Sequence, residues 1–169
     1  MDDMHSTPVA DAAVADADQD QKLVEQMVQL SGAGVADCVA IAGPEHLGLL
    51  LALCRRGFVR AECVAVATGP RLRSEIDVLW IPGAGSEQDV AAALTRMLRM
   101  LRPGGTVVVT YGPQAATMSG VTPSRRLRDF RRTLTGFGLA PLGVDGSRTL
   151  IAAYKPWMNA SGVERRHAA

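Results

Sequence analysis

The sequence predicts an α/β fold: a doubly wound, mostly parallel sheet that ends in an antiparallel hairpin. Two observations support this prediction. Between residues 75 and 112 an apolar strand, an amphipathic helix and a second apolar strand follow one another, and such a unit forms parallel strands with a right-handed crossover. Near the end of the chain, Asp145-Gly146-Ser147-Arg148 separates two further strands, and its Asp-Gly pair is typical of a β-hairpin turn.

The elements predicted before this unit are a helix, a strand, a second helix and a second strand. Residues 19–30 carry an apolar face and end at Ser31-Gly32-Ala33-Gly34, which predicts the first helix. The next three elements are expected at residues 35–42, 47–56 and 62–67. The next strand, at 76–81, follows after an unusually short connection.

The helix predicted at 86–101 has suitable residues at both ends. Ser86 can cap its amino terminus, and Glu87 and Asp89 lie where the helix dipole is positive. Pro103-Gly104-Gly105 is expected to end it. The remaining predicted elements are a strand at 106–111, a helix at 124–136, and strands at 139–144 and 149–154.

Three features follow one another here: the strand Asp77-Val78-Leu79-Trp80-Ile81, a helix ending Arg99-Met100-Leu101-Arg102-Pro103-Gly104-Gly105, and a strand of valines. Together they resemble the second half of class I S-adenosylmethionine-dependent methyltransferases. The resemblance covers residues 20–155. It implies a Rossmann-like sheet with strand order 3-2-1-4-5-7-6, here lacking the third strand because residues 68–74 are too few to form it. The strand at 62–67 then becomes an open edge, where we expect a homodimer or another protein partner.

The expected ligand site lies beyond the carboxyl ends of the strands, as in other open α/β sheets. The candidate residues for binding S-adenosylmethionine are Gly43, Pro44, Glu45, His46, Thr68, Pro82 and Gly83. The resemblance implies a three-glycine loop beside the cofactor's amino-acid part, but only Gly43 matches it, since Glu45 and Leu47 take the other positions. Glu45 would face the cofactor's carboxylate with a like charge. The resemblance also implies an acidic residue at the end of the second strand, where it would accept hydrogen bonds from the cofactor's ribose. The sequence has no acidic residue at this position, near Thr68.

Other chemically capable residues have structural interpretations beside functional ones. His46 is a candidate general base, with a helix-capping or surface role as the favoured alternative. Asp77 is expected to support the start of its strand, and Trp80 to belong to the core rather than to stack on adenine. Three cysteines without metal-ligand spacing predict reduced thiols, no metal site and a cytoplasmic protein. No catalytic residue is assigned.

The composition separates an acidic front from an arginine-rich back. Residues 1–18 are expected to be an acidic segment that is disordered or weakly helical, 19–155 the domain, and 156–169 a flexible tail. The two charged regions could attract each other within or between molecules. Five arginines between 125 and 132 could bind phosphates, but an amphipathic surface helix is favoured, so no nucleic acid is expected. No apolar run is long enough to cross a membrane, and the arginine and alanine usage suggests a bacterial source.

The function predicted from these observations is that of a methyltransferase-like protein without efficient methyl transfer, acting as a binding or regulatory module. The alternative is an active S-adenosylmethionine-dependent methyltransferase with an unidentified acceptor. Whether the chain is an enzyme stays open at this point.

Overall fold

The computed structural model describes residues 8–43, 46–65, 75–111, 123–144 and 150–157. Its elements, in chain order, are α1 (Pro8–Ser31), β1 (Val39–Ala42), α2 (Leu47–Arg55), β2 (Ala61–Val64), β3 (Ile76–Ala84), α3 (Glu87–Met97), the 3₁₀ helix η1 (Leu98–Met100), β4 (Leu101–Tyr111), α5 (Pro123–Gly136), β5 (Ala140–Val144) and β6 (Leu150–Tyr154).

The strands form one sheet in the order β2-β1-β3-β4-β6-β5. The first four run parallel, whereas β6 is antiparallel to both β4 and β5. This confirms the predicted doubly wound sheet with its terminal hairpin. Among the described residues this is the order 3-2-1-4-5-7-6 without the third strand, which is the order that the resemblance implied.

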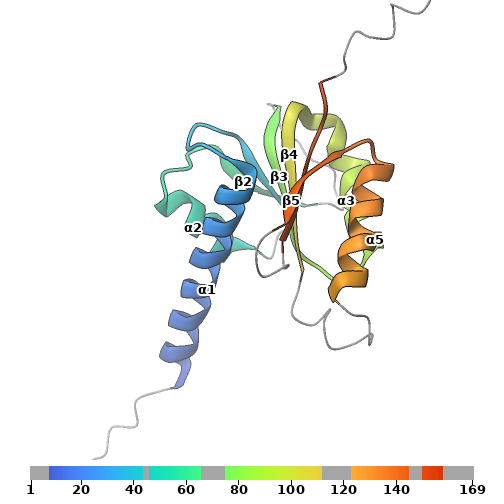
Figure 1. Cartoon of the computed structure of the whole chain (residues 1–169). Helices are drawn as coiled ribbons and strands as arrows, with labels where there is room; N and C mark the ends of the chain where they lie inside the picture. The colour runs from blue at the N-terminus through green and yellow to red at the C-terminus, as the bar shows by residue number, and fades with distance from the viewer. Residues whose placement is uncertain (1–7, 44–45, 66–74, 112–122, 145–149, 158–169) are drawn as a thin grey trace, which may run out of the picture.

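Helices cover both faces of the sheet (Figure 1). On one face, Val24 and Met27 of α1 and Leu53 of α2 pack against Ile41 and Trp80. On the other face, α3 and α5 pack against alternate residues of the same strands. Because successive strand side chains point to opposite faces, both faces of these apolar strands are buried.

Trp80 belongs to the core, as predicted, since its side chain is fully buried. Its indole Nε1 has no hydrogen-bond partner within the described ranges. A fully buried indole on the α1 and α2 face leaves no exposed ring on which adenine could stack.

The amino terminus of α3 is capped by Ser86, as predicted. The Asp89 N–H donates to Ser86 Oγ at 3.2 Å, and the Ser86 N–H donates to Asp89 Oδ2 at 2.9 Å. This reciprocal pair is a capping box, which satisfies two backbone donors and fixes where α3 begins after the end of β3.

The prediction that Pro103-Gly104-Gly105 forms the turn ending the preceding helix is wrong. The α-helix ends at Met97, η1 follows, and the three residues lie inside β4. The register with β3 shifts here, from Ile76 opposite Leu101 to Val78 opposite Thr106. A Cβ on Gly105 would lie 2.9 Å from the Arg102 carbonyl oxygen and 3.0 Å from that of Asp77. Glycine is required because two backbone segments approach closely.

Helix α1 begins at Pro8, eleven residues before the predicted start of the first helix. Residues 8–18 are therefore helical, which agrees with the weakly helical alternative predicted for this segment and not with the disordered one. Their many alanines favour a helix even where few side chains can be buried. The predictions for residues 1–7, the turn at 145–148 and most of the tail lie outside the described residues, and the division into a domain with two loose ends stays a prediction.

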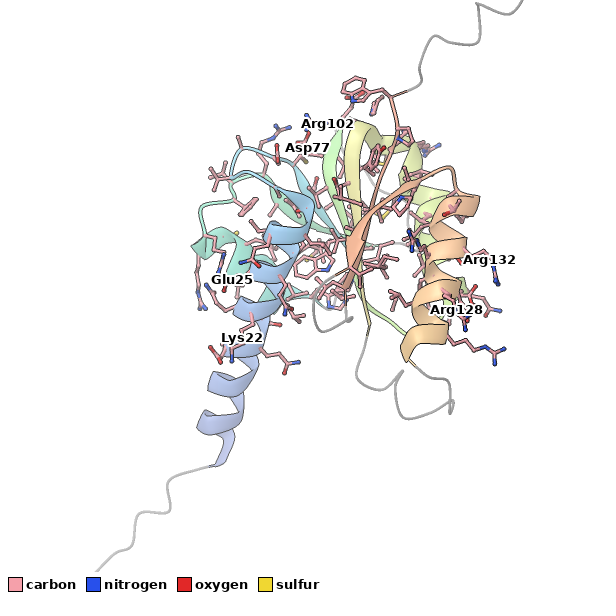
Figure 2. All side chains as sticks on the ribbon, viewed as in Figure 1. Lys22, Glu25, Asp77, Arg102, Arg128 and Arg132 are labelled. Atoms are coloured by element: carbon pink, nitrogen blue, oxygen red, sulfur yellow. The ribbon has the colours of Figure 1, made fainter. Side chains whose placement is uncertain are left out.

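Asp77 joins the starts of β1, β3 and β4 at the amino-terminal edge of the sheet (Figure 2). Its buried carboxylate accepts a 2.6 Å hydrogen bond from the Cys38 N–H and forms a 2.8 Å ion pair with Arg102 Nε. This is the structural role that the sequence predicted for it. It lies at the edge opposite to the candidate ligand site.

The residues on both sides of the predicted start of the flexible tail, Lys155 and Trp157, contact the start of β4. Lys155 Nζ donates to the carbonyl oxygens of Leu98 and Leu101, at 3.2 and 2.6 Å. The Lys155 carbonyl accepts from the Gly104 N–H at 2.7 Å. The Trp157 ring covers Gly104, so the last described residues pack on the junction between η1 and β4.

Strand β2 is an edge of the described sheet. The carbonyls of Arg60 and Val64 accept hydrogen bonds from Val39 and Gly43, so these residues face β1. Alternate residues face opposite sides in the plane of a sheet, so the backbone groups of Ala61 and Cys63 point outward.

None of the described helices is long and apolar enough to cross a membrane.

Candidate functional site

The site lies at the carboxyl ends of β1 and β3, where Gly43 and Gly83 flank the imidazole of His46. Gly43 has a φ of 117°, and a Cβ there would lie 3.2 Å from His46 Cδ2. Gly83 has a φ of 62°, and its Cβ position would lie 4.0 Å from His46 Cε1. The structure therefore brings together three of the predicted site residues.

His46 occupies the N-cap position of α2, but its side chain does not cap the helix. Of the two structural roles predicted for His46, helix-capping or surface, the helix-capping role is therefore wrong, and the half-buried ring turns toward the two glycines. The His46 carbonyl accepts from the Leu50 N–H at 3.1 Å and from Cys63 Sγ at 3.7 Å. A role as general base stays a prediction.

Pro82 and Gly83 form an irregularity at the end of β3. The register moves from Ile81 opposite Val109 to Ala84 opposite Tyr111, which leaves one extra residue on β3. Pro82 is buried, and the Gly83 N–H donates to Thr110 Oγ1 at 3.2 Å. Such bulges re-aim the end of a strand beside a site. The sequence analysis missed Thr110, whose one signal is a hydroxyl at the end of a run of valines.

Asp20 is a second residue that the sequence analysis missed. Its carboxylate, which comes from α1, lies against Gly48 in the first turn of α2, with Cγ 3.1 Å from where a Cβ would stand. The first turn of α2 has no acidic residue of its own. Helix amino termini attract anions, so the chain places one of its own carboxylates where an acidic ligand group would be favoured. No local pattern could have found this contact between residues 28 positions apart.

Pro44, Glu45 and Thr68 lie outside the described residues, so their predicted places in the site stay predictions. Within the part of the chain that the structure describes, no group of three or more His, Cys, Asp or Glu side chains could hold a metal ion. Burial raises the pKa of the Cys63 thiol, which keeps it protonated at neutral pH. The described site thus offers glycine backbone, one imidazole, one hydroxyl and the Asp20 carboxylate.

Neither a protein-family model nor a curated protein sequence matches the chain. Solved structures do match. Magnesium protoporphyrin IX methyltransferase (ChlM) from Synechocystis PCC 6803 with bound SAM has a TM-score of 0.57 at 12% identity, over 92% of this chain and 86% of that chain. The sugar N-methyltransferase KedS8 from Streptoalloteichus sp ATCC 53650 has a TM-score of 0.57 at 12% identity, over 83% and 87%. This chain has a class I methyltransferase-like fold.

The methyltransferase-like fold does not by itself determine the reaction. The [4+2]-cyclase SpnF has a TM-score of 0.55 at 14% identity, over 80% of this chain and 81% of that chain. A cyclase and methyltransferases therefore share this architecture, and function has to be argued from the site.

The described residues of this methyltransferase-like fold fit S-adenosylmethionine poorly. Gly43 has the open backbone that the resemblance implies, but the His46 ring occupies the space beside it. The cofactor's carboxylate would also approach an α2 amino terminus at which Asp20 already places a negative charge. We derive no methyl-transfer step from this arrangement.

Proposed function

We propose that this chain is a divergent methyltransferase-like protein that lacks efficient methyl transfer and acts as a binding or regulatory module. The shared fold supports its relation to methyltransferases. Its candidate partners are proteins, reached through the β2 edge or the arginine-rich helix. A cytoplasmic location is part of the proposal and rests on the three free thiols Cys38, Cys54 and Cys63.

The observation that carries the proposal is the Asp20 carboxylate against the first turn of α2. A carboxylate there is stabilised by the helix dipole and repels a second carboxylate brought by a ligand. Glu45, three residues before Gly48 in the sequence, would add to this negative charge. Both effects weaken binding of the amino-acid part of S-adenosylmethionine.

The second candidate function is an active S-adenosylmethionine-dependent methyltransferase with an unidentified acceptor. A neighbour solved with bound SAM and the positive φ of Gly43 favour it. In that case the backbone of Gly43 and Gly83 would contact the cofactor. The Asp20 carboxylate of α1 would have to move away from the first turn of α2.

Calorimetric titration of the full chain with S-adenosylmethionine and S-adenosylhomocysteine tests the proposal. We expect no binding heat at millimolar ligand and no rise in melting temperature. Micromolar binding would overturn the proposal. In that case the melting temperature should rise, because a ligand at a hundredfold excess over its Kd stabilises the folded state by about 2.7 kcal/mol.

Two matched variants locate the obstruction. Asp20→Asn removes the charge beside α2, whereas Asp18→Asn removes an exposed charge from the same helix. If Asp20 excludes the ligand, only Asp20→Asn should show S-adenosylmethionine binding. Equal behaviour of the two variants would remove Asp20 as the cause.

A further inference from the structure

The outer side of α5 presents an exposed arginine face, which we define as Arg125, Arg128, Arg131 and Arg132. Figure 2 shows Arg128 and Arg132 pointing away from the sheet. Among the described residues, the one ion pair on this face joins Arg132 Nη1 to Asp129 Oδ1 at 3.7 Å, and an exposed pair of that length contributes little. Arg128, Arg131 and Arg132 line a shallow region of the surface that is open to solvent. The arginine face is therefore available to an acidic partner.

The first half of α1 has the opposite charge. We call residues 8–18 the acidic half of α1; it carries Asp11, Asp16 and Asp18, and no basic residue occurs before Lys22. Asp18 pairs with Lys22 at 2.7 Å, but both side chains are mostly exposed and such pairs are weak. The first fully buried residue among those described in α1 is Val24, and Figure 1 shows the acidic half extending away from the other helices and the sheet.

The acidic half and the arginine face cannot meet within one chain. Helix α1 packs on one face of the sheet with α2, whereas α5 packs on the other with α3. The acidic half continues the packed half of α1 as one helix of 24 residues. The sheet therefore stands between the two charged surfaces, and a contact between them requires a second molecule.

We infer that two copies of this chain associate through the acidic half of α1 of one copy and the arginine face of α5 of the other. The spacing of the charges fits as well as their sign. Asp11 and Asp18 are seven residues apart, as are Arg125 and Arg132, and seven residues are two helical turns, or about 10.5 Å. A twofold pair would contain this contact twice. The inference is independent of cofactor binding, so the titration above can fail without affecting it.

Sedimentation velocity of the full chain over a range of concentrations tests the inference. At about 20 mM salt, where the Debye length is roughly 20 Å, we expect a sedimentation coefficient that rises with concentration toward that of a dimer. At about 500 mM salt, where it is roughly 4 Å, the protein should be monomeric. A monomer under both conditions, or a dimer that persists at high salt, would overturn the inference.

A charge swap makes the test specific. We expect two double variants to be monomeric at low salt: Asp11→Lys/Asp18→Lys and Arg128→Glu/Arg132→Glu. In each of them, the first half of α1 and the outer face of α5 carry charge of the same sign, so two copies of the same variant repel each other. An equimolar mixture of the two variants should recover the dimer, since both contacts again join opposite charges. Self-association of either variant alone at the level of the unaltered chain would contradict the proposed interface.

The matched control is Arg55→Glu/Arg99→Glu, which makes the same change in net charge at exposed positions on α2 and η1. This variant should still form dimers at low salt. Cys63→Pro removes an outward backbone donor from β2, and loss of the dimer in it alone would assign the interface to the sheet edge and overturn the inference. Binding of a DNA or RNA oligonucleotide by an otherwise monomeric protein, lost in Arg128→Glu/Arg132→Glu, would also overturn it.

Discussion

The Asp77 side chain joins the starts of three strands. Asp77→Ala should lower the free energy of unfolding by about 2–3 kcal/mol, because the buried Cys38 N–H loses its acceptor and Arg102 loses its ion pair. Asp77→Asn should cost less, about 1 kcal/mol, because an amide oxygen can still accept from Cys38. Urea unfolding followed by circular dichroism measures both.

Arg132→Ala is the control for Asp77. The Arg132 side chain is 81% exposed and its ion pair with Asp129 is long, so the free energy of unfolding should change by less than about 0.5 kcal/mol. Equal losses for Asp77→Ala and Arg132→Ala would contradict the role that we give to Asp77.

The three cysteines should differ in reactivity according to burial. Cys54 is exposed, Cys63 half-buried and Cys38 buried. Because burial raises the pKa of Cys63, its thiolate fraction is smaller than that of an ordinary thiol at any pH below that pKa. Iodoacetamide near pH 8 should therefore modify Cys54 first, Cys63 more slowly and Cys38 last.

Peptide mass spectrometry of the alkylated chain reads out this order. The alkylation rate of Cys63 should level off at a higher pH than that of an ordinary free thiol, since a raised pKa moves the plateau to higher pH. If Cys38 reacted as fast as Cys54, the start of β1 would be open to solvent and the packing around Asp77 would be wrong.

At the scale of elements, the start of β4 depends on glycine. Gly105→Ala should lower the free energy of unfolding by about 2 kcal/mol, because its Cβ would press on the backbone carbonyls of Arg102 and Asp77 and on the Leu101 side chain. Gly136→Ala is the matched control. Apart from its chain neighbours and the backbone of α5, no atom of the described residues lies within 4 Å of a Cβ at Gly136, in the last turn of α5. This change should therefore stabilise by about 0.5 kcal/mol.

Urea unfolding of the two glycine variants separates a packing effect from a general effect of adding a methyl group. Opposite signs are expected. A neutral Gly105→Ala would mean that β4 can shift away from β3 at this point, and the register between Ile76 and Val78 would not be as tightly determined as the contacts indicate.

At the scale of the whole molecule, α1 contributes to packing with its second half. A chain of residues 19–157 keeps Asp20, Val24 and Met27 together with Trp157, and should unfold cooperatively with a free energy within about 1 kcal/mol of that of the full chain. It should also lose the salt-sensitive self-association, because it lacks Asp11, Asp16 and Asp18.

Urea unfolding and sedimentation of this shortened chain test both expectations. If the chain of residues 19–157 failed to fold, residues 1–18 or 158–169 would belong to the domain, and at least one of the two predicted domain boundaries would be wrong. If it folded but still associated at low salt, the acidic half of α1 would not be the interface.

The sequence by itself determined the element types and the terminal hairpin, because these follow from local periodicity and turn residues. The strand order was predicted from the resemblance to class I methyltransferases. Ser86 predicted the start of α3 because an N-cap is a local signal, whereas the reciprocal bond from Asp89 was seen only in the structure. Gly43 and Gly83 were found because the loops after β1 and β3 fall at the carboxyl edge of a parallel sheet.

Only the tertiary structure decided which distant residues meet. The contact of Asp20 with Gly48 and the bond from Gly83 to Thr110 join separate elements whose mutual position depends on packing. The sequence around Pro103-Gly104-Gly105 predicted the end of a helix. The residues that lie against these glycines in the structure, Asp77 and Trp157, are distant in the sequence, so no local pattern could show these contacts. Local pattern specifies elements, whereas the chemistry of this site depends on how those elements pack, and that explains why the fold was predictable and the character of the site was not.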